Sequence, residues 1–246
     1  MLIQPTIDNL KTLKLFGMVQ ALETQLTNAD AAALPFEDRF GMIVDCEVTT
    51  RDNTRLQRLI RAAKLGQQAM VEDVESNPAR GVDKALFLSL STGDWLKQHQ
   101  NVIIIGKTGV GKSYLACALA QKACRLGFSV LYQRASRLFE ELRIARADGS
   151  YVKMLGNLAK RELLVLDDFG LEALTSDQRR DLLEVIEDRY QTSSTLITSQ
   201  IPVEHWHELI GDPTIADAIL DRVVHNAHKL SLKGESRRKS KSKDAQ

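Results

Sequence analysis

Cysteine and long apolar runs are both scarce in this sequence of 246 residues. The three cysteines, Cys46, Cys117 and Cys124, lack the spacing of a metal site, and an odd number does not suggest a disulfide framework. Cys117 and Cys124 fall in one predicted helix, where we expect two small buried side chains in a reducing compartment. No apolar run approaches the ~18 residues that would cross a bilayer, and the first residues lack the basic start and apolar core of a signal peptide. We therefore expect a cytoplasmic protein with no membrane partner.

Net charge is also scarce, because the formal total is only +1, and this excludes a protein that is basic all over. The positive charge that is present gathers in two places. Residues 51–64 carry five cations against one acid, and the tail from Lys229 carries seven cations against two acids. Local basic patches on a neutral body are compatible with binding to nucleic acid.

The first part of the chain has the apolar periodicity of helices. Apolar residues recur every three or four positions from Ile7 to Leu26, and a second helical stretch begins near Phe36 and can run on through Ile60. We assign residues 1–66 to a helical N-terminal domain that serves assembly, DNA binding or partner binding. Residues 67–92 are assigned to a linker and junction, because prolines and glycines interrupt the pattern there.

From Asn101 onward, short apolar runs alternate with helical segments. The predicted strands cover 102–105, 129–132, 163–166 and 195–198, and the predicted helices cover 112–126, 136–147 and 176–192. This order predicts an α/β fold in which a parallel sheet is covered by helices on both faces. We place this domain at residues 93–233, followed by a basic C-terminal tail at residues 234–246.

A phosphate-binding loop is predicted where the first strand ends. Residues 106–113 match the pattern G-x-x-x-x-G-K-[ST] between a strand and a helix, which a plain glycine turn rarely does. The glycines let backbone N–H groups surround phosphate oxygens, and the helix N-terminus adds partial positive charge. We expect Lys112 to reach the β- and γ-phosphates of ATP and the Ser113 hydroxyl to ligate Mg²⁺. The predicted nucleotide-binding segment is Gly106, Lys107, Thr108, Gly109, Val110, Gly111, Lys112 and Ser113.

Two acids follow the apolar strand at Leu163–Leu166. Carboxylates there lie at the C-terminal edge of the sheet, where ligands of open α/β sheets bind. We expect Asp167 to hold the Mg²⁺ shell and Asp168 to polarise the attacking water as a general base. An aspartate after a strand also serves as a turn former, which is the structural alternative.

Several further segments are characteristic when they are taken together with the phosphate loop. They are Lys14–Met18, Thr92–Trp95, Leu163–Gly170, Thr198–Gln200, Asp217–His228 and Gly234–Arg238. In this combination the chain resembles IstB, the family of ATP-binding helper proteins of a group of bacterial insertion sequences. The resemblance covers nearly the whole chain, and its terminal segments discriminate better than the phosphate loop. The ATPase half is also similar to bacterial helicase loaders.

The resemblance implies an AAA+ P-loop ATPase, preceded by a small all-helical domain, that forms a homo-oligomer on double-stranded DNA with ATP at subunit interfaces. It also implies a partner transposase that the protein directs and stimulates. Arg222 matches the arginine finger that is donated to the neighbouring subunit, and the resemblance favours this role. Without the resemblance, an arginine on an amphipathic helix that is paired with Asp221 or solvated is the favoured interpretation. Ser199 and Gln200 stand where a polar sensor is expected, and Arg238, or else Arg237, stands where a second phosphate-sensing arginine is expected.

The cations of residues 51–64 fall on one side of a helical wheel. They are Arg51, Arg55, Arg58 and Arg61, opposite an apolar side. Such a face either contacts DNA phosphates or is simply solvated, and the resemblance favours DNA. Phosphate contacts carry no sequence information, so we expect largely sequence-independent binding.

Two other functions use the same phosphate loop. A replicative helicase loader would use the helical N-terminal half to grip a helicase, and that half resembles the transposition family instead. A monomeric small-molecule kinase would need a mobile lid with acceptor-binding residues and would be indifferent to DNA.

Overall fold

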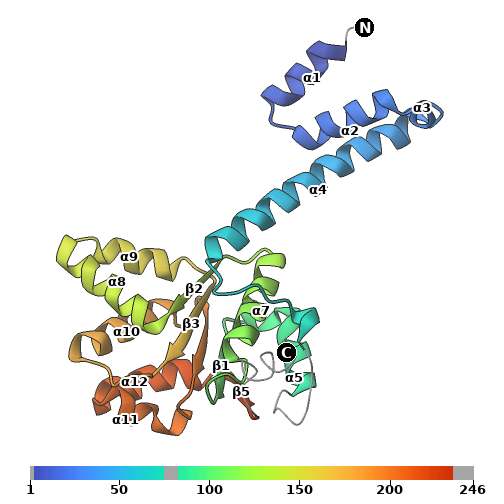
Figure 1. Cartoon of the computed structure of the whole chain (residues 1–246). Coiled ribbons are helices and arrows are strands. Elements are labelled where there is room, and N and C mark those ends of the chain that lie inside the picture. Colours follow the sequence, from blue (N-terminus) through green and yellow to red (C-terminus); the bar gives the residue numbers. More distant parts are fainter. Residues whose placement is uncertain (1–2, 75–82, 235–246) are drawn as a thin grey trace, which may run out of the picture. The chain divides into compact units, whose positions relative to one another are not determined.

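The computed structural model describes residues 3–74 and 83–234, and the chain divides into two compact units, Met1–Arg58 and Leu59–Gln246 (Figure 1). Arg237 and Arg238, with the rest of the predicted tail beyond residue 234, lie outside the described residues. Within the described ranges, no helix has the length and apolar character needed to cross a membrane.

The first unit is helical, as the apolar periodicity predicted. Its helices are α1 (Ile3–Thr12), α2 (Phe16–Thr27), the short α3 (Ala29–Ala32) and the long α4 (Phe36–Ala63), which continues into the second unit. The single apolar stripe from Ile7 to Leu26 is divided between α1 and α2. The division occurs because the backbone turns at Lys14, whose φ of 59° ends a right-handed helix.

A carboxylate of α4 holds the start of α2 within this unit. The Glu47 side chain accepts hydrogen bonds from the backbone N–H groups of Gly17 (2.7 Å) and Met18 (3.1 Å). These N–H groups have no partner inside their own helix, so the carboxylate satisfies them and complements the positive helix end. Gly17 allows the approach, because a Cβ there would lie 2.6 Å from the Cys46 carbonyl oxygen.

The second unit is built on a five-stranded sheet with the order β2-β3-β4-β1-β5, in which every pair is parallel. The strands are β1 (Asn101–Gly106), β2 (Val130–Arg134), β3 (Leu163–Phe169), β4 (Ser194–Ser199) and β5 (Ala227–Leu232). The α-helices are α5 (Lys84–Thr92), α6 (Asp94–Lys97), α7 (Lys112–Arg125), α8 (Ala135–Asp148), α9 (Tyr151–Ala159), α10 (Ser176–Arg189), α11 (Trp206–Ile210) and α12 (Pro213–Val224), with 3-10 turns at Val71–Asp73 and Val203–His205.

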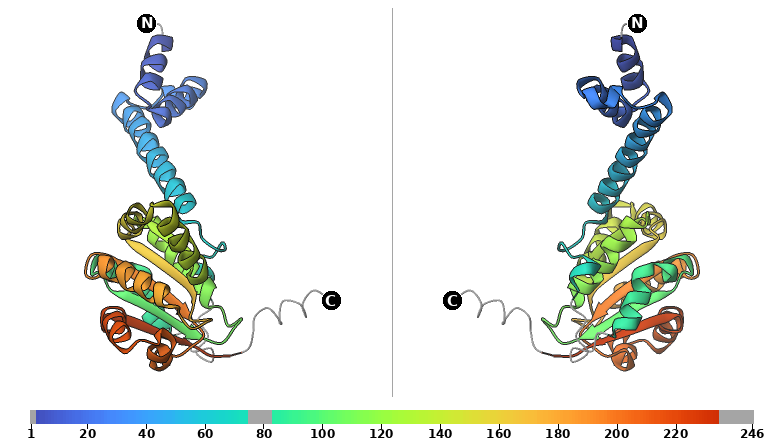
Figure 2. Two further views of the ribbon diagram at one scale, coloured as in Figure 1. Left: turned by 90° about the vertical axis from the view of Figure 1, so that its left-hand side faces the viewer. Right: turned by 90° about the vertical axis from the view of Figure 1, so that its right-hand side faces the viewer.

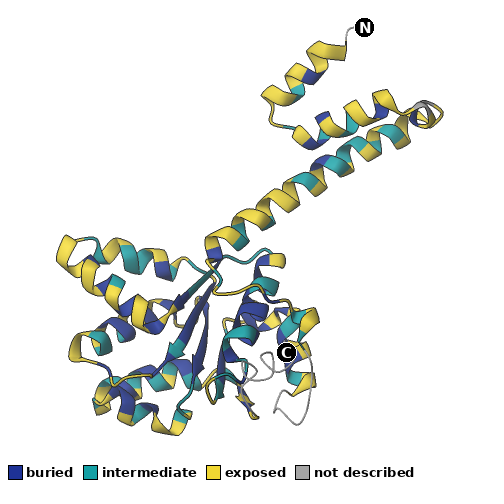
Figure 3. Cartoon of the chain, viewed as in Figure 1, coloured by how far each residue is buried: buried dark blue, intermediate teal, exposed yellow. Residues whose placement is uncertain are grey.

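Helices cover both faces of this sheet, as the sequence predicted (Figures 1 and 2). On one face the main core joins α8, α10 and α12 to β1, β3 and β4. On the other face lies α7, where Cys117 and Cys124 are buried as free thiols. The three central strands, β1, β3 and β4, are accordingly buried along most of their length, whereas the edge strands β2 and β5 are partly exposed (Figure 3). The four predicted strands and the three predicted helices of this region are confirmed, whereas α9, α11, α12 and β5 were not predicted.

Candidate functional site

The C-terminal ends of the parallel strands meet at one edge of the sheet, and the predicted phosphate loop follows β1 there. Its turn uses two residues in the left-handed region, Gly109 (φ 83°) and Gly111 (φ 108°), which only glycine adopts at low cost. Gly106 is required for a different reason. A Cβ at Gly106 would lie 2.7 Å from the Leu232 carbonyl oxygen of β5, so the loop begins tightly against the neighbouring strand.

A cavity of about 480 Å³ opens over this loop. Among its walls are Thr108, Gly109, Gly111, Lys112, Ser113, Asp167, Asp168 and Gln200, which were all predicted site residues. Lys112 is buried, and its Nζ donates to the Lys107 carbonyl oxygen at 3.1 Å. The cavity therefore combines a buried ammonium group with the N-terminus of α7.

Asp167 is the centre of a hydrogen-bond network on the cavity wall. Its Oδ1 accepts from the hydroxyls of Ser113 (2.9 Å) and Thr198 (2.5 Å). Its Oδ2 accepts from the Tyr132 hydroxyl at 2.5 Å. Asp167 is only 1% exposed, so each carboxylate oxygen is held by protein groups rather than by bulk water.

Tyr132 keeps its proton in this arrangement. Burial and the neighbouring Asp167 carboxylate raise the pKa of the Tyr132 hydroxyl far above its ordinary value, with burial the larger cause. The hydroxyl is therefore a donor at every physiological pH. The carboxylate that it binds keeps a fixed orientation.

Asp168 lies beside Asp167 but has a different environment. Its backbone is in the left-handed region (φ 57°), at an irregularity in the pairing of β3 with β4 between Leu166 and Phe169. Its N–H donates to the Thr198 hydroxyl at 3.0 Å. The irregularity turns Asp168 into the cavity, although strict alternation would have placed it on the opposite face from Asp167.

The two predicted sensor positions at the end of β4 differ in their surroundings. Ser199 is fully buried, and its hydroxyl donates to the Phe169 carbonyl oxygen at 2.8 Å. Gln200 lines the cavity, and its Oε1 accepts from the Thr108 hydroxyl at 2.6 Å. The amide of Gln200, rather than the hydroxyl of Ser199, thus faces the space above the phosphate loop.

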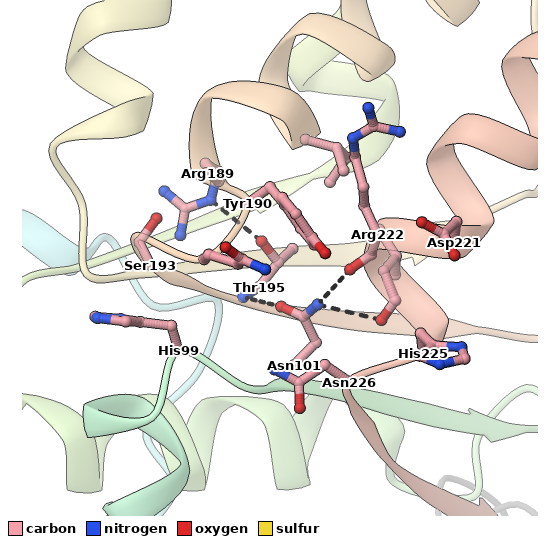
Figure 4. Close-up of a pocket in the computed structure, with 13 residues that line it drawn as sticks. His99, Asn101, Arg189, Tyr190, Ser193, Thr195, Asp221, Arg222, His225 and Asn226 are labelled. Atoms are coloured by element: carbon pink, nitrogen blue, oxygen red, sulfur yellow. Dashed lines mark hydrogen bonds between the residues drawn. The ribbon is translucent and has the colours of Figure 1, made fainter.

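Arg222 lies near the other edge of the sheet, at the end of α12 (Figure 4). The Asn101 side chain, at the start of β1, donates to the carbonyl oxygens of Arg222 and Val223, both at 3.2 Å. The Arg222 guanidinium pairs with Glu187 (3.1 Å) and lies 5.8 Å from the Tyr190 ring centre. The structure therefore does not bring Arg222 to the phosphate loop of its own chain, and its partner is Glu187 rather than the Asp221 considered from the sequence.

The predicted DNA-binding arginines are all exposed on α4. Arg51, Arg55 and Arg58 line a shared cavity of about 490 Å³ in the first unit, together with Lys14 and the exposed Phe16. Arg51 is paired with Glu47 at 2.6 Å. Arg61 lies on the last turn of the same helix.

The residues of the phosphate-loop cavity fit a nucleotide and a divalent cation. Backbone N–H groups and Lys112 suit phosphate oxygens, which a Cβ in the loop would exclude. The Ser113 hydroxyl and the Asp167 carboxylate, 2.9 Å apart, are oxygen donors of the kind that Mg²⁺ prefers.

Sequence reasoning missed several residues that line or support this cavity. Tyr132, Arg134 and Gln67 line it, and Thr198 links the two aspartates. Thr198 had been noted only as part of a characteristic segment. The position of Tyr132 two residues before the end of a strand adjacent to β3 was the available signal, but it required the strand order.

The chain matches the family model described as IstB-like ATP binding protein over residues 8–245. A Sinorhizobium fredii protein named as an insertion sequence ATP-binding protein, y4pL, is 50% identical over 240 residues, which are 98% of this chain and 98% of that protein. A Pseudomonas fluorescens protein named as an ATP-binding protein of insertion sequence IS1162 is 47% identical over 203 residues, or 82% of this chain and 88% of that protein.

Solved structures share the fold at lower identity. The DnaC helicase loader superposes with a TM-score of 0.57 at 22% identity, covering 67% of this chain and 97% of that one. AMPPCP-bound DnaA from Aquifex aeolicus gives 0.58 at 15% identity, covering 74% of this chain and 55% of that one. The chain has the AAA+ P-loop fold of these structures, and it belongs to the IstB-like ATP-binding protein family.

Proposed function

We propose that this protein is a Mg²⁺-dependent ATPase that assembles on double-stranded DNA and regulates a partner transposase through ATP binding and hydrolysis. The observation that carries the proposal is the contact of the Ser113 hydroxyl with Asp167 above a complete phosphate loop. Relatives named for insertion sequences and for ATP binding support the biological setting.

The residues of the cavity divide the work of hydrolysis. The glycine turn and the N-terminus of α7 bind the phosphates, and Lys112 neutralises the β- and γ-phosphates. Ser113 and Asp167 hold Mg²⁺, which when bound supplies positive charge to the phosphate oxygens. Asp168, turned into the cavity, accepts the proton of the attacking water, and Gln200 orients groups near the γ-phosphate.

Arg222 serves the active site of a neighbouring subunit in this proposal. It is tied to Asn101 at the start of β1, whereas the phosphate loop follows the other end of that six-residue strand. At about 3.3 Å per residue, the two ends are roughly 16 Å apart. An arginine beyond the reach of its own site fits a head-to-tail oligomer, in which each subunit completes the next.

Arg51, Arg55, Arg58 and Arg61 are proposed to contact the DNA backbone. The cavity that the first three line with Lys14 has four cationic side chains against two acids, Glu47 and Asp52, so a net positive charge surrounds this groove in the first unit. Contacts of this kind are to phosphates, so binding should be largely independent of sequence and should weaken steeply with salt.

The test is ATP hydrolysis with and without long duplex DNA, with particle size measured by light scattering in the same samples. DNA-stimulated turnover together with ATP-dependent growth of particles supports the proposal, and a transposase-stimulation assay then tests the last part of it. Turnover that ignores DNA, from a protein that stays monomeric, would instead favour a kinase or an adaptor. The roles of Arg222 and of the arginines on α4 would then fall together.

A further inference from the structure

Tyr132 is the only described residue outside the phosphate loop and β4 that gives Asp167 a side-chain hydrogen bond. The two Asp167 oxygens have separate partners: Oδ1 faces Ser113 and Thr198, and Oδ2 faces Tyr132. A carboxylate rotates about the bond that joins it to the side chain unless both oxygens are held. The Tyr132 hydroxyl therefore helps to fix the plane of the Asp167 carboxylate relative to Ser113.

Tyr132 has a second close neighbour at its hydroxyl end. Gly66 lies against the end of its ring, and a Cβ at Gly66 would lie 2.6 Å from the Tyr132 hydroxyl oxygen and 2.7 Å from Cζ. Gly66 is not in the left-handed region, so its backbone accepts other residues, and the space beside Tyr132 is what calls for glycine. Leu65, Ala69 and Val71 pack with Tyr132 against α7 in the same small cluster.

We propose that Tyr132 is a positioning residue for the metal-binding carboxylate of Asp167, and that the segment around Gly66 keeps it in place. This inference rests on the proposed function, since it concerns how the same site holds Mg²⁺. Gly66 follows the end of α4 at Ala63 by three positions, so the arrangement also connects the metal site to the segment that leaves the long helix.

The expected size of the effect follows from other metal sites, where loss of a group that orients a ligand costs about 10–100-fold in metal affinity or activity. In Tyr132→Phe the ring remains and only the hydroxyl is lost. The Asp167 Oδ2 is then a buried acceptor without a partner, and the carboxylate rotates away from the orientation that Ser113 requires.

The first experiment measures Mn²⁺ binding, as a stand-in for Mg²⁺, in the presence of a non-hydrolysable ATP analogue, from the loss of the free-ion EPR signal. Tyr132→Phe should weaken Mn²⁺ binding about 10–100-fold. It should raise the Mg²⁺ concentration for half-maximal ATP turnover to a similar extent.

Tyr151→Phe is the matched control. The Tyr151 hydroxyl donates to another buried carboxylate, Asp181, at 2.8 Å, and it does not line the phosphate-loop cavity. Tyr151→Phe also removes hydroxyl contacts with Arg146 (2.7 Å) and Glu184 (3.0 Å), so it is the more severe loss of hydrogen bonding. A purely structural role for Tyr132 predicts unchanged metal binding in both variants.

Gly66→Ala tests the other half of the proposal without touching a hydrogen-bonding group. Its methyl group would collide with the Tyr132 hydroxyl and ring end, so the hydroxyl would leave its place against Asp167 and metal binding should weaken as in Tyr132→Phe. The double variant should bind Mn²⁺ no more weakly than the worse of the two single variants, because both changes remove the same contact between Tyr132 and Asp167.

The outcomes separate this inference from the proposed function. If the wild-type protein binds no Mn²⁺ with the analogue, the nucleotide site itself is wrong. If the wild type binds it and Tyr132→Phe binds it equally well, the ATPase proposal stands and the positioning role of Tyr132 is overturned. A Gly66→Ala protein with normal metal binding would remove the segment around Gly66 from the mechanism.

Discussion

Two inactive variants should restore activity to each other if Arg222 acts across a subunit interface. Lys112→Ala removes the cation that binds the phosphates, and Arg222→Ala removes the finger while leaving the phosphate loop intact. Loss of a finger typically costs ~10³-fold or more in turnover. Each variant alone should therefore be almost silent in a steady-state phosphate-release assay with DNA present.

The size of the recovery follows from the arrangement of the site. A working interface needs the phosphate loop of an Arg222→Ala subunit and the finger of a Lys112→Ala neighbour. In an equimolar mixture with random assembly, about a quarter of head-to-tail interfaces meet this condition. Turnover near a quarter of the wild-type value is therefore expected, because the Arg222–Glu187 pair at 3.1 Å must open equally in the wild type and in the mixture.

The assay mixes the two variants at a fixed total concentration and varies their ratio. ATP turnover should be highest near equal amounts of the two variants and should vanish when either variant is present alone. A flat line at the level of the single variants, with assembly on DNA confirmed by light scattering, would refute the reasoning. Arg222 would then have only the surface role that its contact with Glu187 describes.

Three further outcomes are expected. Asp168→Asn should still bind ATP but should stop turnover. Asparagine tolerates the left-handed backbone (φ 57°) but does not accept a proton from water. Normal phosphate release by this variant would show that Asp168 is not the base. Gly17→Ala should destabilise the first unit by about 1–3 kcal/mol, because the new methyl group would collide with the Cys46 carbonyl oxygen. Denaturant unfolding followed by circular dichroism measures this loss. An unchanged unfolding midpoint would contradict the close packing of α2 on α4. The hydrogen bond from Arg51, together with those from two backbone N–H groups, lowers the pKa of Glu47. Ionised Glu47 therefore stabilises the folded protein above the ordinary carboxyl pKa, and this stabilisation is lost as the pH falls through the lowered pKa. The difference in thermal midpoint between wild type and Glu47→Gln should therefore shrink on acidification, and a constant difference would exclude this linkage.

The sequence was most informative where local pattern alone determines structure. The strand before the phosphate loop, the loop itself and α7 follow from an apolar run, spaced glycines and a helical period, which need no distant partner. The same holds for the long helix from Phe36. The break between α1 and α2 was missed because the apolar period continues across it, whereas the turn depends on the backbone conformation of Lys14.

Tertiary pairing decided what local pattern did not. Tyr132 and Asp167 are 35 positions apart and meet only because β2 lies beside β3. Asp168 faces the cavity only because the β3–β4 register shifts next to it. The roles of Asp168, Gln200 and the arginines on α4 remain predictions, as do the domain boundaries that we assigned from the sequence.

The pairing of Leu232 with Gly106 has a consequence for the residues that follow β5. Neighbouring strands are about 4.8 Å apart, so the chain leaves the sheet directly beside the phosphate loop. In the sequence, Arg238 comes only six positions after Leu232. The pairing of β5 with β1 therefore fixes the exit of the chain from the sheet next to the nucleotide cavity, whatever the residues after it do.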